Sequence, residues 1–169
     1  MKPLLAQICR ATVAAGIMSV WALAAQAQST QAPSAELRAL LAKHYGGYAA
    51  GSDPAAIFAQ TTKPDWANCG ANGAACQTRD ELAGALSNGL HKLVPDMKWQ
   101  ILDEMVSGDQ VIVRGQGTGT PVGAFLGVPA SGKSFQVMSI DIHTIKDGRI
   151  AHTYHLEDWA AALSQLSAK

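Results

Sequence analysis

The spacing of apolar residues changes along this chain, from every third or fourth position before residue 95 to every second position after it. The first pattern predicts helices, and the second predicts strands that bury one face. Three helices are expected in the first region, each opened by a capping residue: Ser34 (to about Tyr48), Asp53 (a short helix) and Thr78 (to Pro95). Residues 63–77 are expected to form an irregular loop between the second and third helices.

Strands dominate the rest of the chain. They are predicted over 97–106, 110–118, 133–145 and 149–156, followed by a last helix that begins at Asp158. Because the helices come first and the hairpins follow, we predict an α+β fold with the helices packed on one face of an antiparallel sheet.

The first 27 residues have the features of a secretory signal peptide. Lys2 and Arg10 supply positive charge, residues 11–25 form an apolar run, and Ala25-Gln26-Ala27 is a small-x-small cleavage site. The apolar run is shorter than the roughly 20 residues that span a bilayer, which favours cleavage over a retained anchor. We therefore expect a signal peptide (1–27), a polar leader (28–34) and one domain (35–169), in a periplasmic or secreted protein.

The charge and cysteines of the predicted mature chain limit its partners and its redox state. Removing Lys2 and Arg10 leaves 11 basic and 13 acidic residues, a net charge of about −2 without a basic patch. Nucleic acid and anionic membrane are therefore not expected partners. Cys69 and Cys76 lie in a glycine-rich segment that allows a disulfide in an oxidising compartment, with two free thiols as the alternative.

The hairpin from Ser139 to His155 concentrates three of the five histidines around Asp141. A two-residue turn at Asp147-Gly148 would place Asp141 opposite Tyr154 and mix polar and apolar side chains on each face. A three-residue loop with a bulge at Gly148 would instead pair Asp141 with Thr153 and separate the faces, so we predict this register.

In the predicted register the hairpin has one polar and one apolar face. The polar face carries Ser139, Asp141, His143, Ala151, Thr153 and His155. The other face carries Ile140, Ile142, Thr144, Ile150, His152 and Tyr154. From the pattern alone, the polar face would be exposed to solvent.

An ordered set of motifs resembles the SnoaL-like polyketide cyclases (ester cyclases) of the NTF2-like superfamily. The set comprises Arg114 with Gly117-Thr118-Gly119-Thr120, the loop Gly127-Val-Pro-Ala-Ser-Gly132, Ile140-Asp141-Ile142, Lys146-Asp-Gly-Arg-Ile150 and Asp158. The resemblance covers about residues 34–167. It implies an NTF2-like cone, in which three N-terminal helices pack on the concave face of a curved antiparallel sheet and a short C-terminal helix follows.

The resemblance also implies a site on the concave face, lined by the polar face of the hairpin. His155 stands at the family's catalytic aspartate position, and Asp141 stands where the family often has histidine. We therefore predict that His155 removes a proton α to a carbonyl or activates water, while Asp141 orients it. Pro121 departs from the family pattern, because a histidine is common there. Six further pocket residues are predicted: His143, Arg114, Trp66, Asn68, Ser139 and Thr153.

Three other interpretations are weaker. Residues 127–134 match a P-loop pattern, but a strand is expected to follow them instead of the required helix. His152 and His155 are expected on opposite faces of a strand, so no metal site is predicted. Arg114 beside Asp141 resembles part of the Asp-Arg-Asp set of limonene epoxide hydrolases, without a clear second aspartate. His44 and His91, on predicted helices, are expected at the surface or edge.

The sequence thus predicts a secreted domain that binds a small, largely apolar carbonyl compound without a cofactor. Acid-base chemistry by His155 and Asp141 would allow cyclisation, isomerisation or hydrolysis of that compound. The alternative is a non-catalytic periplasmic binding or interaction module on the same fold. The apolar outer face of the sheet implies, through the same resemblance, a homodimer.

Overall fold

The structure is a computed structural model that describes residues 32–70, 72–73 and 75–168. The predicted signal peptide and residues 28–31 of the polar leader therefore lie outside the described residues. None of the described helices combines the length and the apolar character needed to cross a membrane.

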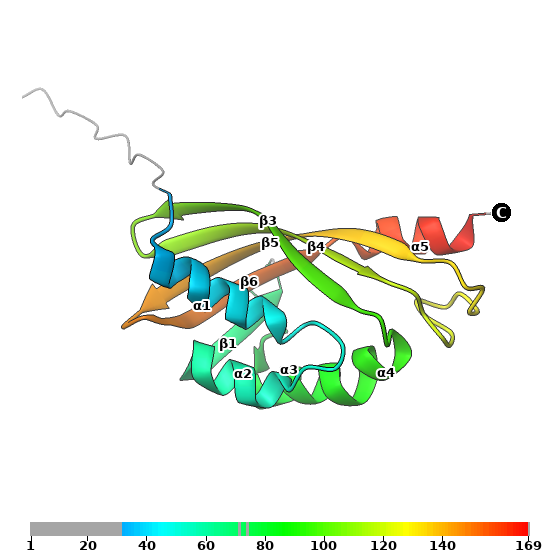
Figure 1. The fold of residues 1–169 in the computed structure, drawn as a ribbon, viewed down its shortest axis with the longest axis horizontal. Helices are drawn as coiled ribbons and strands as arrows, with labels where there is room; N and C mark the ends of the chain where they lie inside the picture. The colour runs from blue at the N-terminus through cyan, green and yellow to red at the C-terminus, as the bar shows by residue number, and fades with distance from the viewer. Residues whose placement is uncertain (1–31, 71, 74, 169) are drawn as a thin grey trace, which may run out of the picture.

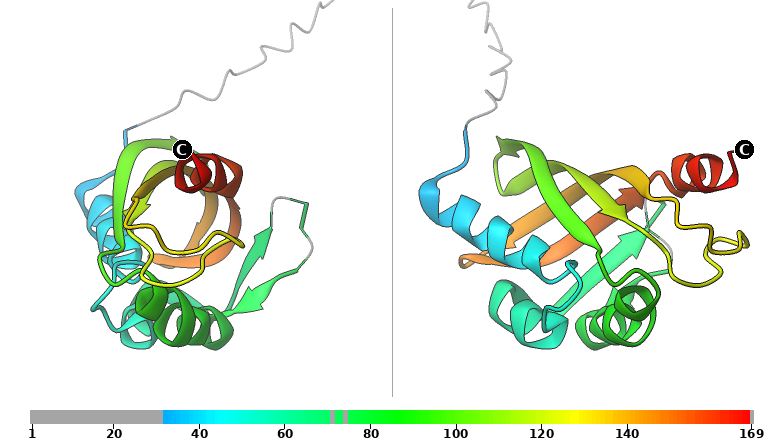
Figure 2. Two further views of the ribbon diagram at one scale, coloured as in Figure 1. Left: turned by 90° about the vertical axis from the view of Figure 1, so that its right-hand side faces the viewer. Right: turned by 45° about the vertical axis from the view of Figure 1, so that its right-hand side comes forward.

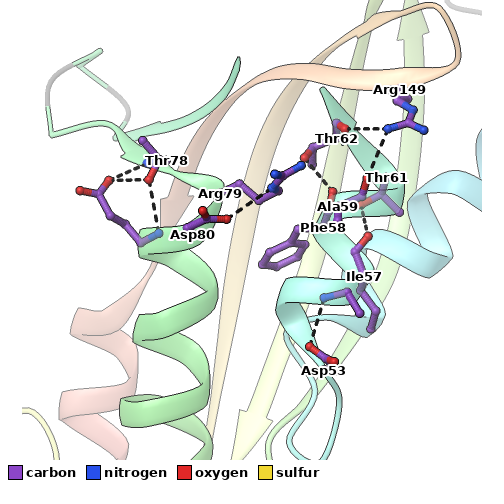
Figure 3. Close-up of polar contacts among 12 residues, drawn as sticks. Asp53, Ile57, Phe58, Ala59, Thr61, Thr62, Thr78, Arg79, Asp80 and Arg149 are labelled. Carbon is purple, nitrogen blue, oxygen red and sulfur yellow. Dashed lines mark hydrogen bonds and ion pairs between the residues drawn. The ribbon is translucent and has the colours of Figure 1, made fainter. Parts of the chain in front are cut away.

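The helices begin where the sequence predicts them. They are α1 (Ala35–Gly46), α2 (Pro54–Thr61), a third segment made of α3 (Arg79–Ala85), η1 (Leu86–Leu90) and α4 (His91–Leu93), and α5 (Trp159–Ser167). Side chains of Ser34, Asp53, Thr78 and Asp158 accept hydrogen bonds from backbone N–H groups of the first turns. Thr78 and Glu81 make both hydrogen bonds of the predicted capping box (Figure 3).

Six strands form one curved sheet in the order β2-β1-β6-β5-β4-β3. Their bounds are β1 (Thr62–Gly70), β2 (Gln77–Thr78), β3 (Lys98–Ser107), β4 (Gln110–Gly119), β5 (Phe135–Lys146) and β6 (Arg149–Glu157). All neighbouring strands are antiparallel except β1 and β6, which are parallel.

Strand β1 corrects the predicted irregular loop over 63–77. Lys63, Pro64 and Asp65 hide its strand character in the sequence, because they interrupt the apolar alternation. Its parallel partner in the sheet is β6, which lies more than 80 residues away in the chain. Arg149 fixes the start of β1 by donating to the carbonyl oxygens of Ala59 and Thr62, at 3.3 and 3.4 Å (Figure 3).

The β5–β6 hairpin adopts a register different from the predicted one. Asp147 and Gly148, with φ of 49° and 70°, form a two-residue turn that pairs Lys146 with Arg149. The register then shifts between Thr144 and Ile145, so that Asp141 pairs with His155 instead of Thr153. The bulge therefore lies in β6, at the extra residue Ala151, and not in the turn.

This bulge explains both what was correct and what was wrong in the predicted faces. Ser139, Asp141, His143, Thr153 and His155 do share one face, because residues beyond the bulge keep their alternation. Residues before it are shifted by one, so Ile150 is fully buried in the core instead of lying on the outer face.

The helices α1 to α4 lie on one side of the curved sheet, and α5 continues beyond its far end (Figures 1 and 2). Their apolar residues pack on the concave face against Val111, Val113 and Ile150. A second group of buried residues, which includes Val94, Met97 and Phe135, packs beneath α5. The α+β fold with three N-terminal helices on the concave face is thus confirmed.

Several individual expectations are corrected. His44, a residue of α1 that was expected at the surface or edge, is fully buried. Met105 and Met138 are 40% and 49% exposed on the outer face of the sheet. The P-loop-like segment, residues 127–134, belongs to the β4–β5 connection. As expected, strand β5 follows it in place of the helix that a phosphate-binding P-loop requires.

Cys69 and Cys76 form a disulfide, with Cα atoms 3.9 Å apart. The bridge ties the end of β1 to the residue before β2. The predicted pairing is therefore present in the structure.

Candidate functional site

A cluster of hydrogen-bonded polar side chains lies on the concave face of the sheet, where it meets α1. We call it the Asp141 cluster. Its members are Tyr45 from α1, Ser139, Asp141 and His143 from β5, and Thr153, His155 and Glu157 from β6.

Asp141 is the centre of the cluster and is almost completely buried, with 1% of its surface exposed. Its Oδ1 atom contacts Nδ1 of His155, the residue directly opposite it in the sheet. Its Oδ2 atom accepts hydrogen bonds from the Tyr45 hydroxyl at 2.7 Å and from the Ser139 hydroxyl at 3.3 Å. Both carboxylate oxygens are therefore satisfied inside the protein, as a buried charge requires.

The hydrogen-bond pattern determines the tautomer of His143. Tyr45 donates its only proton to Asp141, so it must accept the hydrogen bond from Nε2 of His143, at 3.0 Å. In a neutral imidazole Nδ1 is then an acceptor, and the Thr153 hydroxyl donates to it at 2.9 Å. Thr153 in turn accepts from the indole N–H of Trp66, also at 2.9 Å. His143 is therefore a neutral link between α1, β5 and β6.

His155 is positively charged, unlike His143, because carboxylates contact both of its ring nitrogens. Nδ1 pairs with Asp141, and Nε2 lies 3.2 Å from Oε2 of Glu157. A carboxylate only accepts, so both nitrogens must carry protons. Burial by itself lowers the pKa of His155, but the hydrogen bonds to Asp141 and Glu157 outweigh it and raise the pKa to about 10. His155 is thus an imidazolium at neutral pH.

The same contacts shift the pKa values of the other cluster members. Burial raises the pKa of the Asp141 carboxyl, but the hydrogen bond and charge of His155 prevail, and the net shift is downward. Burial lowers the pKa of His143 to about 4, in agreement with its neutral state. Burial also raises the pKa of the Tyr45 phenol, which therefore keeps its proton.

These shifts predict that the folded protein is most stable near pH 6.5. The folded pKa of His155, about 10, exceeds its ordinary value of 6.5, so its contribution is complete below pH 6.5 and is lost as the pH rises to 10. His143 is held neutral in the fold but binds a proton when unfolded, so stability also falls between pH 6.5 and about 4. Loss of the Asp141 charge destabilises the fold at still lower pH.

Urea unfolding at intervals from pH 4 to 9.5 measures this profile. His155→Gln should remove most of the decline on the alkaline side and leave the acidic decline. A wild-type stability that is constant from pH 6.5 to 9.5 would contradict the assigned charge of His155.

Aromatic side chains enclose the cluster. The Tyr48 ring is stacked on His155, with centroids 6.3 Å apart, and the Trp99 ring lies 5.5 Å from Tyr48. On the other side, the buried His44 ring contacts Trp66 and His143 edge-on, at 5.7 and 5.6 Å. Burial lowers the pKa of His44 well below its ordinary value, so this ring is also neutral.

The structure brings most of the predicted site residues together. Asp141, His155, His143, Ser139 and Thr153 belong to the Asp141 cluster, and Trp66 joins it through Thr153. Asn68 is buried beside them on β1, opposite Thr153, and its Oδ1 atom has no partner among the described residues.

Arg114 does not belong to this group. It pairs with Ile140, so it lies on the outer face of the sheet, where it is 3.9 Å from Asp103. Val113, its neighbour, is the β4 residue opposite Asp141. The comparison with epoxide hydrolases, which needs Arg114 beside Asp141, therefore has no geometric support.

Sequence reasoning missed four residues of the site: Tyr45, Tyr48, His44 and Glu157. Tyr45 continues the apolar spacing of the first helix, four residues after Leu41, so the pattern gives no signal for its hydroxyl group. The spacing of Leu37, Leu41, His44 and Tyr48 was the available signal for His44, because it continues one helical stripe. Glu157 could have been found from β6 itself, since it lies two residues after His155 and faces the same side.

Within residues 32–70, 72–73 and 75–168, no group of three or more His, Cys, Asp or Glu side chains has the arrangement of a metal site.

A family model and several solved structures match this chain, and the solved structures share its α+β fold. A family model described as SnoaL-like polyketide cyclase matches residues 50–166. No curated protein sequence matches the chain.

Several solved structures are similar. One is IdmH, a proposed polyketide cyclase from Streptomyces antibioticus, with a TM-score of 0.68 and 22% identity over 78% of this chain and 99% of that protein. TsrD from Streptomyces laurentii has a TM-score of 0.67 and 26% identity, covering 82% of this chain and 100% of that protein. A proposed polyketide cyclase from Bacillus cereus has a TM-score of 0.63 and 27% identity, covering 78% and 80%.

Proposed function

Because the chain belongs to the SnoaL-like polyketide cyclase family, we propose that it binds a small, largely apolar carbonyl compound on its concave face and catalyses a reaction by proton transfer. Cyclisation, isomerisation and hydrolysis all fit this proposal, because none of them changes the oxidation state overall. The fold supports small-molecule binding, and the Asp141 cluster supports the chemistry.

The observation that carries the proposal is the position of His155 between two carboxylates. Its side chain and that of Glu157 are 16% and 15% exposed, whereas the Asp141 side chain is 2% exposed. A bound molecule could therefore contact His155 and Glu157, while Asp141 holds His155 from behind. In this arrangement Asp141 is a positioning residue.

The charge state of His155 favours proton donation over the proton abstraction that the sequence suggested. An imidazolium with a pKa of about 10 has no free lone pair to act as a base at neutral pH. In place of its hydrogen bond to Glu157, its Nε2–H group can donate to a carbonyl oxygen of the substrate and stabilise the negative charge that develops there. Asp141 would orient the ring through Nδ1 during this step.

Glu157 is the best-placed base. Its Oε2 atom accepts from both His155 and the indole N–H of Trp159, at 3.2 and 2.7 Å, so Oε1 takes part in neither hydrogen bond. In the proposed step, a carboxylate oxygen of Glu157 takes the proton α to the carbonyl, and the electron pair of that C–H bond forms the enolate. The enolate then attacks a second carbonyl carbon in a cyclisation, and the alkoxide formed there takes the proton from Glu157. In an isomerisation the enolate takes that proton back at another carbon.

A non-catalytic binding module remains the second candidate. Specific support comes from the hydrogen bonds of the Asp141 cluster, in which both oxygens of Asp141 and all four ring nitrogens of His143 and His155 already have partners. Such a network also stabilises a fold without any reaction.

The two candidates differ in whether a bound carbonyl compound loses its α proton. Mature protein (28–169) should be mixed in D₂O with small apolar ketones and 1,3-diketones, with binding followed by thermal shift and exchange by loss of the α C–H signal in proton NMR. The catalytic proposal expects exchange faster than in buffer and saturable with at least one compound that binds. Binding throughout the panel without accelerated exchange would refute catalysis through an enolate and support the binding module.

We also propose that the protein is exported to the periplasm or the exterior. The disulfide between Cys69 and Cys76 supports this location, because such bonds persist in oxidising compartments. The charged and apolar pattern of residues 1–27 supports it independently.

The outer face of the sheet supports a proposed homodimer. Met138, Tyr154 and Leu156 are 49%, 42% and 56% exposed there, beside the partly buried Ile140 and Ile142. Contiguous exposed apolar side chains of this kind mark interaction surfaces.

Met138→Glu is expected to convert the dimer to a monomer, because it would bury two charges at the interface. Light scattering after size-exclusion chromatography measures the mass. Val122→Glu is the matched control, since Val122 is 64% exposed on the β4–β5 connection and should leave the dimer intact. A monomeric wild-type protein would refute the proposed dimer.

A further inference from the structure

Trp99 has a buried hydrogen-bond donor without an acceptor. Its indole Nε1 atom is inaccessible to solvent and has no partner in the described part of the chain. The other two tryptophans of the domain differ, because Trp66 donates to Thr153 and Trp159 donates to Glu157. A buried donor that stays unpaired destabilises the fold, so it calls for an explanation.

Two glycines of β4 provide the space that the Trp99 ring occupies. Trp99 lies on β3 directly opposite Gly117, and a Cβ atom at Gly117 would lie only 2.5 Å from the ring. A Cβ atom at Gly115 would lie 2.9 Å from Nε1 of Trp99 and 2.7 Å from the Ser139 hydroxyl. The absence of side chains at both positions lets the indole lie against the concave face of the sheet.

The same geometry places the indole Nε1 atom near a member of the Asp141 cluster. Nε1 lies beside Ser139, which donates to Asp141 and is paired with Glu157 across the sheet. The Tyr48 ring contacts both the Trp99 ring and the His155 ring, with centroids 5.5 and 6.3 Å apart. Trp99, Tyr48 and His155 therefore border one region of the concave face, where two N–H donors are present.

We propose that the Trp99 indole N–H is a second donor to the carbonyl oxygen of the bound substrate, together with Nε2–H of His155. The inference rests on the proposed function and adds a catalytic residue to it. Two donors stabilise the enolate oxygen more than one, because hydrogen bonds to a charged oxygen are the stronger kind. The indole keeps its proton throughout, so no further group has to accept or supply one.

The test uses 4-nitrophenolate, a small planar anion whose oxygen resembles that of an enolate. It is titrated into ¹⁵N-labelled mature protein, and the indole N–H signals are followed by NMR. The Trp99 signal, identified by its absence in Trp99→Phe, should move downfield on saturation, while that of Trp66, already bonded to Thr153, should stay in place. Trp99→Phe should also weaken binding about tenfold, which corresponds to the loss of one hydrogen bond.

The ring signals of His155 separate failure of this inference from failure of the proposed function. If the probe moves the His155 signals but not the Trp99 indole signal, Trp99 is not a donor to the ligand and the proposed site stands. If neither moves at saturating probe, both proposals are wrong. Because the signals are measured in wild-type protein, the result does not depend on the folding of the variant.

Discussion

Replacing Asp141 by alanine is expected to lower the free energy of unfolding by about 3–5 kcal/mol, the usual cost of removing one partner of a buried ion pair. The variant would leave the His155 imidazolium with only Glu157 as a charged partner. It would also leave the hydroxyls of Tyr45 and Ser139 without their acceptor inside the protein. Urea unfolding at pH 6.5 measures the loss.

Asp103→Ala is the matched control for this prediction. Asp103 is also a strand carboxylate with a cationic neighbour, but its side chain is 54% exposed and its distance to Arg114 is 3.9 Å. An exposed pair of this kind contributes about 0–1 kcal/mol, so the control should be nearly neutral. If both variants lose the same small amount, the Asp141 cluster does not stabilise the fold in the way inferred here.

Glu157→Gln is expected to reduce α-proton exchange by about 10²–10⁴-fold, the range that general base catalysis supplies. The amide cannot take the proton, but its oxygen can still accept the hydrogen bonds from His155 and Trp159. The structure of the site should therefore survive while the base is lost. The measurement is the exchange rate in D₂O with a carbonyl compound that the wild-type protein binds.

Asp103→Asn serves as the control, because it makes the same chemical change on the outer face of the sheet. It should leave exchange unchanged. Exchange by Glu157→Gln at the wild-type rate would exclude Glu157 as the base and return that role to another residue. A lower rate with an unchanged thermal midpoint and unchanged affinity would support the assignment.

Local sequence was sufficient wherever neighbouring residues decide the structure. Ser34, Asp53 and Thr78 cap helices because their side chains reach backbone groups two or three residues away. The alternation of β5 and β6 likewise assigned Asp141, His143, Thr153 and His155 to one face. The family motifs then indicated that this face lines the interior.

Long-range contacts decided what the sequence predicted wrongly or missed. The bulge at Ala151 buries Ile150 among core residues from other strands, which no property of the turn sequence requires. Strand β1 forms because β6 offers it a parallel partner, although its own residues lack an apolar alternation. Tyr45 bonds to Asp141 across 96 residues of sequence, so its role was invisible in the helix pattern.

The protonation states of the site residues also separate what local sequence determines from what long-range contacts determine. The sequence by itself determined that a histidine and an aspartate would share one face of the β5–β6 hairpin in an α+β fold, because strand alternation and the helix caps are local. Only the tertiary structure decided that His155 is a cation and His143 is neutral, since these states depend on burial and on which atoms of Asp141, Glu157 and Tyr45 surround each ring. The physical reason is that a pKa responds to charges and solvent in three dimensions, whereas the sequence supplies only the order of the groups.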